Sequence, residues 1–223
     1  MFAKLKRQTG EGGAPGLVER HFVMQDELPN RLREVEIESL DPFLRSLLFT
    51  DGTVTRALGV HVLDSVAVGR ISQVPVPTLP DVAHGLEAPP DEELIRRQVS
   101  IGIGSPSIPV LWAESFMVPD RLPPGFLGLL DGAPDGIGQS LQRFSLESSR
   151  ELCWFGMDSV PEWAPGGRAK DGETLCRLYR IISDGQPAIL IFEYFAVERR
   201  SGAYHLSGVL SHEARRHSRR RVG

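Results

Sequence analysis

The chain has 223 residues, of which 41% are hydrophobic and 24% are charged, and its formal net charge at pH 7 is −4. This length suits one well-buried domain, the composition is that of an ordinary globular protein, and the negative charge argues against bulk nucleic-acid binding. No apolar run approaches the roughly 18 residues that a membrane span needs, and Gly and Pro stand where a signal peptide needs an apolar core. The two cysteines, Cys153 and Cys176, lack metal-type spacing and favour a reducing compartment. We therefore expect a cytoplasmic protein that binds neither nucleic acid nor membrane.

Three segments differ in composition. The start of the chain is Gly-rich and charged, so residues 1–37 are predicted to be a flexible N-terminal extension. Residues 38–200 carry regular apolar patterns and are predicted to form one domain. Residues 201–223 end in an Arg-rich run, which is interpreted as a basic, solubilising tail rather than a phosphate-binding or lipid-binding segment.

A helix is predicted to begin the organised part of the chain. Asp41 can cap it, Pro42 suits its first position, and an apolar stripe runs through residues 43–48. Asp51-Gly52-Thr53 breaks this helix, and Thr53 is placed to cap a second short helical turn. A helical hairpin is therefore expected here.

Strands and helices then alternate in groups. Residues 60–74 resemble a strand, and the Pro-rich residues 75–90 are predicted to form a long surface loop or flap. Further strands are predicted over residues 94–103, 109–118, 146–155, 174–183 and 186–197, with helical segments over 119–132 and 137–141. Strands joined as hairpins with inserted helices predict an α+β fold, with a single antiparallel sheet and helices on one face.

The strongest functional signal is an acidic residue in the most strand-like run of the chain. Successive side chains of a strand point to opposite faces, so Glu193 shares its face with Ile189, Ile191, Phe195 and Val197. Both faces of this strand are apolar, which predicts a central, covered strand. A buried carboxylate is costly unless it is paired, protonated or used in chemistry. Glu193 is therefore a candidate catalytic residue.

A second strand repeats this anomaly with the opposite charge. Arg97 shares the predicted buried face with Ile95, Val99 and Ile101, whereas Arg96 faces solvent. An inward arginine and an inward glutamate indicate either a buried ion pair or a small cavity that binds an anion beside an acid. Both interpretations remain open at this point.

A third ionisable residue lies in the strand at 109–118. Glu114 shares its face with Val110, Trp112 and Phe116. It is either a further interior acid or a carboxylate that is paired or faces an edge.

Several motifs occur in a fixed order over residues 38–198. They are Leu40-Asp41-Pro42 with the following leucines and Asp51-Gly52-Thr53-Val54, the Arg97 strand, Trp112-Ala113-Glu114-Ser115-Phe116-Met117, and Gln186-Pro187-Ala188 leading to Glu193 and Phe195. In this order and spacing they resemble the chorismate pyruvate-lyase family, and within it the actinobacterial branch that makes 4-hydroxybenzoate.

The resemblance implies a fold, a reaction and a set of site residues. It implies an antiparallel sheet of about six strands with two helical flaps, which enclose an aromatic product. Arg97 would bind a substrate carboxylate, Glu193 would serve as proton donor or base, and Val54 and Ile137 would be apolar lids. The family eliminates pyruvate from chorismate without a metal or cofactor, so none is expected here.

One position departs from the family pattern. Related enzymes of bacterial ubiquinone synthesis carry a second arginine where this chain has Ser115, which we assign to the substrate-binding set. Arg180, on a face with Cys176, Leu178 and Ile182, is the candidate to replace that arginine. Because chorismate carries two carboxylates, this departure bears on the identity of the small cyclic or aromatic acid that is bound.

Three hypotheses follow. The first is a chorismate pyruvate-lyase that makes 4-hydroxybenzoate for specialised metabolism. The second is a tailoring enzyme on the same fold, a cyclase or dehydratase acting on a polyketide-like acid, which Ser115 and the long loops at 75–90 and 160–172 favour. The third is a small-molecule-binding module of the kind found in transcription regulators, for which the residues before position 38 are too few to form a DNA-binding domain.

Overall fold

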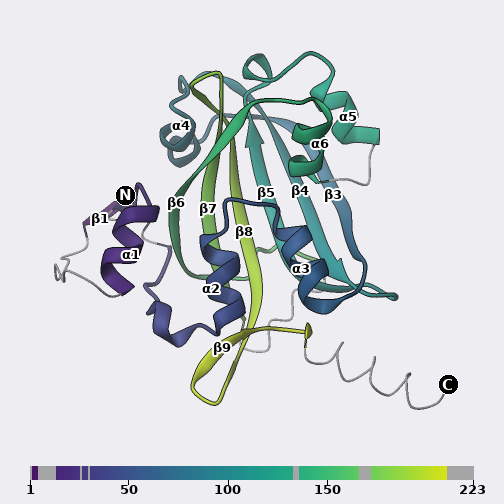
Figure 1. Cartoon of the computed structure of the whole chain (residues 1–223). Helices are drawn as coiled ribbons and strands as arrows, with labels where there is room; N and C mark the ends of the chain where they lie inside the picture. The colour runs from purple at the N-terminus through teal and green to yellow at the C-terminus, as the bar shows by residue number, and fades with distance from the viewer. Residues whose placement is uncertain are drawn as a thin grey trace.

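An antiparallel sheet forms the centre of the molecule (Figure 1). The structure is a computed structural model that describes residues 2–4, 14–25, 27–29, 31–132, 136–165 and 172–209. Within these residues the sheet has seven strands, in the order β3-β4-β5-β8-β7-β6, with β9 paired to β8. The strands are β3 (Val66–Pro77), β4 (Glu93–Ile103), β5 (Ile108–Met117), β6 (Ser148–Ser159), β7 (Glu173–Ser183), β8 (Gln186–Arg200) and β9 (Ala203–Leu206). A separate pair is formed by β1 (Phe2–Lys4) and β2 (Glu27–Pro29).

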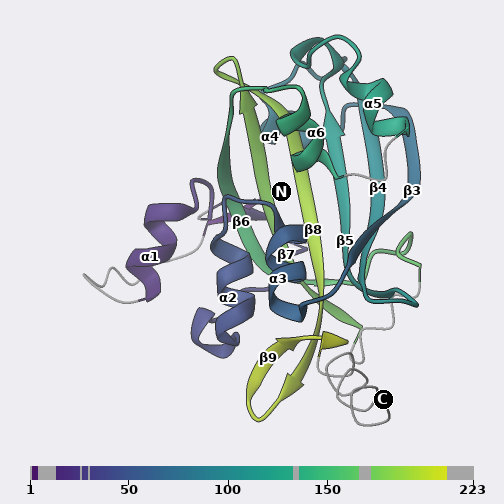
Figure 2. The same cartoon turned by 45° about the vertical axis from the view of Figure 1, so that its right-hand side comes forward.

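Most helices cover one face of this sheet (Figures 1 and 2). Residues of α2, α3, α5 and α6 join a hydrophobic cluster with the inward residues of the strands. The helices are α1 (Ala14–His21), α2 (Pro42–Phe49), α3 (Val54–Val62), α4 (Pro80–Leu86), α5 (Phe126–Gly132) and α6 (Ile137–Arg143), with short 3-10 turns at Ile37–Ser39 and Pro119–Arg121. The predicted α+β class with one antiparallel sheet is confirmed.

The central strand β8 is covered on both faces. Every residue from Pro187 to Glu198 is buried. One face of the sheet contributes to the cluster under α2, α3, α5 and α6, and the other packs in a second cluster with Trp112, Trp154 and Leu190. Since both faces are apolar, a charged side chain between Pro187 and Glu198 lies inside the protein.

The predicted start of α2 is confirmed, and the following helix is longer than predicted. The Asp41 carboxylate accepts the backbone N–H groups of Phe43 at 2.7 Å and Leu44 at 3.0 Å. Residues 60–62, predicted as strand, belong to α3. Its buried residues Val54, Leu58 and Val62 recur every fourth position, which is the helical period.

The predicted long loop at residues 75–90 is wrong. It contains the end of β3 and the helix α4, which packs on the sheet face opposite to the other helices. A Cβ added at Gly85 would lie 2.8 Å from the Leu190 side chain, so the helix backbone lies directly against the sheet. This segment is therefore part of the core and not a flap over the helix-covered face.

Part of the predicted N-terminal extension packs on the sheet. Phe22 is buried and its ring centroid lies 5.2 Å from that of Phe49 and 4.8 Å from that of Phe155. Gln25 exchanges two hydrogen bonds of 3.0 Å with the backbone of Phe155.

At the C-terminal end, β9 lies within the predicted basic tail, and residues 210–223 fall outside the described residues. None of the described helices is long and apolar enough to cross a membrane.

Candidate active site

A cavity lies on the helix-covered face of the sheet. Its volume is about 70 Å³. Its floor comes from β3, β4, β5, β8, β7 and β6, and its cover comes from the α2–α3 connection and the start of α6. It is lined by Gly52, Thr53, Val54, Thr55, Val68, Arg97, Val99, Ile101, Ala113, Ser115, Gly136, Ile137, Gly138, Arg150, Tyr179, Ile191 and Glu193.

The two parts of the cover touch each other above the sheet. A Cβ added at Gly138 would lie 3.1 Å from Oγ1 of Thr53 and 3.3 Å from Nη2 of Arg150. A glycine at this position therefore lets α6 approach the start of α3 closely. Val54 and Ile137 line the cavity from these two elements, in the positions expected of apolar lids.

Arg97 enters the cavity from β4 and is held by protein acceptors. It is 3% exposed, and its Nη1 donates to Oε1 of Gln73 at 2.7 Å and to the Leu130 carbonyl at 3.0 Å. The strand register places Ser115 of β5 directly opposite Arg97. Arg96 lies on the other face, with Nε 4.0 Å from Oε1 of Glu114. The alternation along β4 therefore gave the correct face for Arg97.

Glu193 forms a buried ion pair with an arginine that the sequence analysis did not single out. Arg177 of β7 lies opposite Glu193 of β8 in the register. Its Nε and Nη2 donate to Oε2 of Glu193 at 3.0 Å and 2.5 Å, and the two residues are 1% and 5% exposed. A charge-assisted, two-point contact of this kind fixes the carboxylate in position. Glu193 is therefore in a buried ion pair, but its partner is Arg177 and not Arg97, as the alternation pattern had suggested.

Arg177 also ties the cavity cover to the sheet. Its Nη1 donates to the carbonyl groups of Leu47 at 2.6 Å, Leu48 at 3.2 Å and Thr50 at 2.9 Å. The last carbonyls of a helix lack intrahelical partners and favour a positive charge. One guanidinium therefore satisfies the C-terminus of α2 and orients Glu193.

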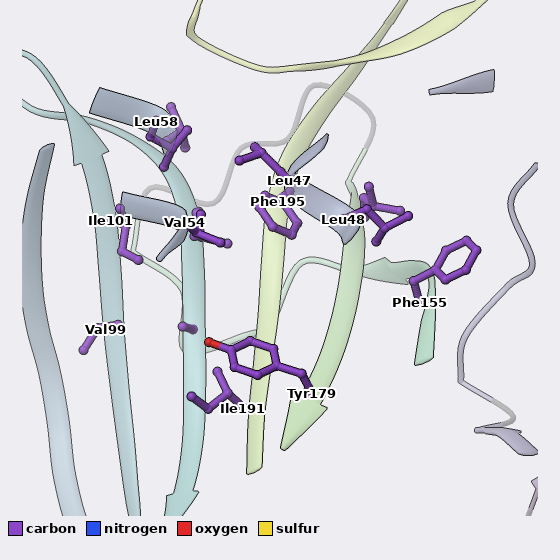
Figure 3. Packing of buried hydrophobic residues seen from close by; sticks show 14 of the residues in the cluster. Leu47, Leu48, Val54, Leu58, Val99, Ile101, Phe155, Tyr179, Ile191 and Phe195 are labelled. Atoms are coloured by element: carbon purple, nitrogen blue, oxygen red, sulfur yellow. The ribbon is translucent and has the colours of Figure 1, made fainter. Parts of the chain in front are cut away.

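Tyr179 completes the surroundings of Glu193. Its hydroxyl donates to Oε1 of Glu193 at 3.3 Å. Burial, and then the nearby Glu193, raise the pKa of Tyr179 well above its ordinary value, so the phenol stays protonated and acts as a donor. Figure 3 shows the ring reaching from β7 toward the space bordered by Val54, Val99 and Ile191.

Arg150 is a further cation on the cavity wall. It comes from β6, and its Nη1 donates to the Asp51 carbonyl at 2.7 Å. Neither the motifs nor the alternation pattern singled it out. Thr53 and Thr55 add hydroxyl groups from the α2–α3 connection and the first turn of α3.

Five of the predicted site residues line this one cavity, namely Arg97, Glu193, Ser115, Val54 and Ile137. Their chemical roles stay predictions.

Arg180 requires a correction, because it does not line the cavity. It lies on the opposite face of β7, where Nε donates to Oε2 of Glu151 at 2.7 Å and Nη1 to Oε1 of Glu87 at 2.7 Å.

Glu114 also lies on the sheet face opposite to the cavity. It accepts a hydrogen bond from Nε2 of Gln98 at 2.8 Å, so it is a paired carboxylate. Within the described ranges, no group of three or more His, Cys, Asp or Glu residues is arranged to hold a metal ion.

Comparisons with known proteins identify the family. The effector domain of PhnF from Mycobacterium smegmatis superposes with a TM-score of 0.49 at 7% identity, over 74% of this chain and 91% of that chain. The chorismate pyruvate-lyase of Mycobacterium leprae is 30% identical over 74% of this chain and 79% of its own length, and that of Mycobacterium tuberculosis is 29% identical over 74% and 84%. The profile described as "Chorismate pyruvate-lyase Rv2949c-like" matches residues 48–201. The chain therefore belongs to the Rv2949c-like chorismate pyruvate-lyase family and is an enzyme of the lyase class.

Proposed function

We propose that this enzyme eliminates pyruvate from chorismate and releases 4-hydroxybenzoate. One observation carries the proposal beyond family membership. The Arg97 guanidinium and the Glu193 carboxylate line the same apolar-walled cavity, as binding and proton transfer on a cyclic acid require.

The reaction needs a proton acceptor and a binding site for carboxylate. The hydrogen on the ring carbon that bears the hydroxyl group leaves as a proton, and the electron pair of that C–H bond completes the aromatic ring. The neighbouring C–O bond breaks at the same time, and the ether oxygen keeps its electron pair. The enolpyruvate that leaves takes up a proton at its methylene carbon and becomes pyruvate. No oxidant or reductant enters this balance.

The described contacts suggest a role for each residue. Arg97 binds the ring carboxylate through charge-assisted hydrogen bonds. Oε2 of Glu193 is occupied by Arg177, whereas Oε1 accepts one long bond from Tyr179, so Oε1 is the oxygen that takes the ring proton. Apolar walls keep bulk water away from the reacting ring.

The size of the cavity implies movement of its cover. Its volume of about 70 Å³ is below the roughly 150 Å³ of a cavity known to hold benzene. The starts of α3 and α6 must therefore separate to admit a six-membered ring. Because the cover has to open for either substrate, this volume does not separate chorismate from the alternative, a tailoring enzyme for polyketide-like acids. The use of the product in specialised metabolism stays a prediction.

Turnover assays with matched variants test the proposal. Purified protein is incubated with fresh chorismate, and pyruvate and 4-hydroxybenzoate are measured. We expect Glu193→Gln and Arg97→Ala to lower kcat/KM by at least about 100-fold, which is about 2.7 kcal/mol. Glu114→Gln and Arg96→Ala, which change the same residue types on the opposite face, should keep most of the activity. A folded wild-type protein that forms neither product would overturn the proposal.

A further inference from the structure

Arg150 is placed in the cavity by one long-range hydrogen bond and by its closeness to Gly138. It lies on β6, opposite Ile181 in the strand register, and therefore on the sheet face that the helices cover. Its Nη1 reaches the Asp51 carbonyl, and its Nη2 lies next to Gly138 of α6. The side chain thus stands between the sheet and both parts of the cover.

The Nε of Arg150 is a donor without a partner among the described residues. It is buried and makes no hydrogen bond within the part of the chain that the structure describes. Arg97 and Arg177, the other arginines of the site, donate to protein acceptors. A buried guanidinium N–H without an acceptor is unfavourable, and arginine prefers a planar, two-oxygen acceptor such as a carboxylate. Nη1 of Arg150 donates to Asp51, and Nε is therefore the donor that a carboxylate in the cavity could accept from.

Arg150 and Arg97 approach the cavity from opposite sides. Strands β5, β8 and β7 lie between β4 and β6 in the sheet order. At an ordinary spacing of about 4.8 Å between neighbouring strands, their backbones would be about 19 Å apart in a flat sheet. Both residues line the cavity, and Glu193 lies on the strand β8 between them. Once the cover opens, a ring can therefore lie between the two guanidinium groups.

We infer that Arg150 binds the second carboxylate of a dianionic cyclic substrate, while Arg97 binds the carboxylate on the ring. The inference rests on the proposed function, in which the second carboxylate is that of the enolpyruvyl ether. It gives the site a second cation from β6, since Ser115, which lies opposite Arg97 on β5, carries no charge. Arg150 would then distinguish the substrate, which has two carboxylates, from the product, which has one.

Binding measurements separate this role from catalysis. The probes are 4-hydroxybenzoate, which has one carboxylate, and a benzoate that carries a carboxyvinyl ether, which has two and cannot aromatise further. Calorimetry should show that Arg150→Gln weakens the dianion at least 30-fold and the monoanion less than threefold. Arg97→Gln should weaken both ligands. Arg150→Lys, which keeps a charge but not the two-point geometry, should recover part of the lost affinity for the dianion.

The outcomes distinguish this inference from the proposed function. Equal effects of Arg150→Gln on both ligands, or no effect on either, would overturn the role of Arg150. The same would follow if Arg180→Gln, on the opposite face, caused the selective loss of dianion binding. Selective dianion binding by a wild-type protein that leaves chorismate unchanged would support the role of Arg150 and contradict the lyase proposal. Thermal unfolding of each variant confirms that it is folded before binding is compared.

Discussion

Nη2 of Arg177 lies 2.5 Å from Oε2 of Glu193, and the two residues face each other across β7 and β8. The same guanidinium holds the carbonyl groups at the end of α2. One buried side chain therefore fixes both the carboxylate of Glu193, the candidate proton acceptor, and the end of α2 at which the cavity cover begins. Arg177 is a positioning residue in this account, since it acts through Glu193.

Removing Arg177 should strongly destabilise the fold. Arg177→Met leaves Glu193 as an unpaired buried charge and leaves the carbonyls of α2 without a donor. We expect the free energy of unfolding, measured in urea, to fall by about 3–5 kcal/mol. The double variant Arg177→Met/Glu193→Leu should recover part of this loss, because it removes both charges. A loss below about 1 kcal/mol for the single variant would show that the pair is not buried as described.

Arg97→Lys should separate charge from geometry at the predicted carboxylate site. Lysine keeps the positive charge but cannot make a planar two-point contact. We expect kcat/KM for chorismate to fall by about 30-fold to 100-fold, mainly through KM, with the unfolding midpoint little changed. Arg96→Lys is the matched control on the opposite face. Unchanged KM in Arg97→Lys would remove Arg97 from the binding site.

Gly138→Ala should hinder closure of the cover. Its new methyl group would meet Oγ1 of Thr53 at 3.1 Å and Nη2 of Arg150 at 3.3 Å. We expect kcat/KM to fall about fivefold to tenfold while the protein stays folded. Gly128→Ala in α5 is the control, since a Cβ there meets nothing within 4 Å. Equal activities of the two alanine variants would show that the approach of α6 to α3 is not needed for turnover.

The buried thiols predict a loss of stability at alkaline pH. Burial raises the pKa of Cys153 from 9.0 to about 12, and burial also raises the pKa of Cys176. Above pH 9 the unfolded chain releases these protons while the folded chain keeps them, so stability falls as pH rises from about 9 toward 12. Each thiol contributes a slope of up to about 1.4 kcal/mol per pH unit.

Urea unfolding at pH 7.5, 9 and 10 measures this slope. Cys153→Ala should flatten it relative to wild type, and native protein at pH 8.5 should not react with a thiol reagent until it is unfolded. Fast modification of the native thiols, or equal slopes in both proteins, would contradict the prediction.

Local sequence signals were sufficient for part of the site. Alternation of side chains along β4 and β8 placed Arg97 and Glu193 on buried faces, and capping chemistry at Asp41 placed α2. These features depend on residues close in sequence. They could therefore be predicted without knowledge of how the strands pair.

Arg180 was predicted and Arg177 was overlooked, because which of the two lies on the cavity face depends on strand register. The Asp-Gly turn pairs Ser183 with Gln186, and continuing that register would place Cys176 opposite Glu193 and Arg180 on the same face. A β-bulge between Ile181 and Ile182 shifts the pairing by one residue and brings Arg177 opposite Glu193 instead. A one-residue shift exchanges the two faces of a strand, and the sequence carried no clear sign of this bulge.

Arg150 could not be predicted for a different reason. Its place in the cavity depends on contacts with Asp51 and Gly138, which come from other elements of the fold. No motif or local pattern shows that β6, the α2–α3 connection and α6 lie next to one another in the fold. Helix α4 in the Pro-rich stretch is a similar case, because its packing against Leu190 compensates for a short and weakly periodic helix.

The most direct test of the account is a proton NMR time course of the wild-type protein with fresh chorismate, run beside Glu193→Gln and a sample without protein. We expect equimolar 4-hydroxybenzoate and pyruvate, formed at a rate proportional to wild-type protein and at least about 100-fold faster than with Glu193→Gln. Chorismate that decays at the same rate in all samples would contradict it. So would a rearranged acid that still carries its pyruvyl group, because the elimination proposed for the Arg97–Glu193 cavity would then not occur.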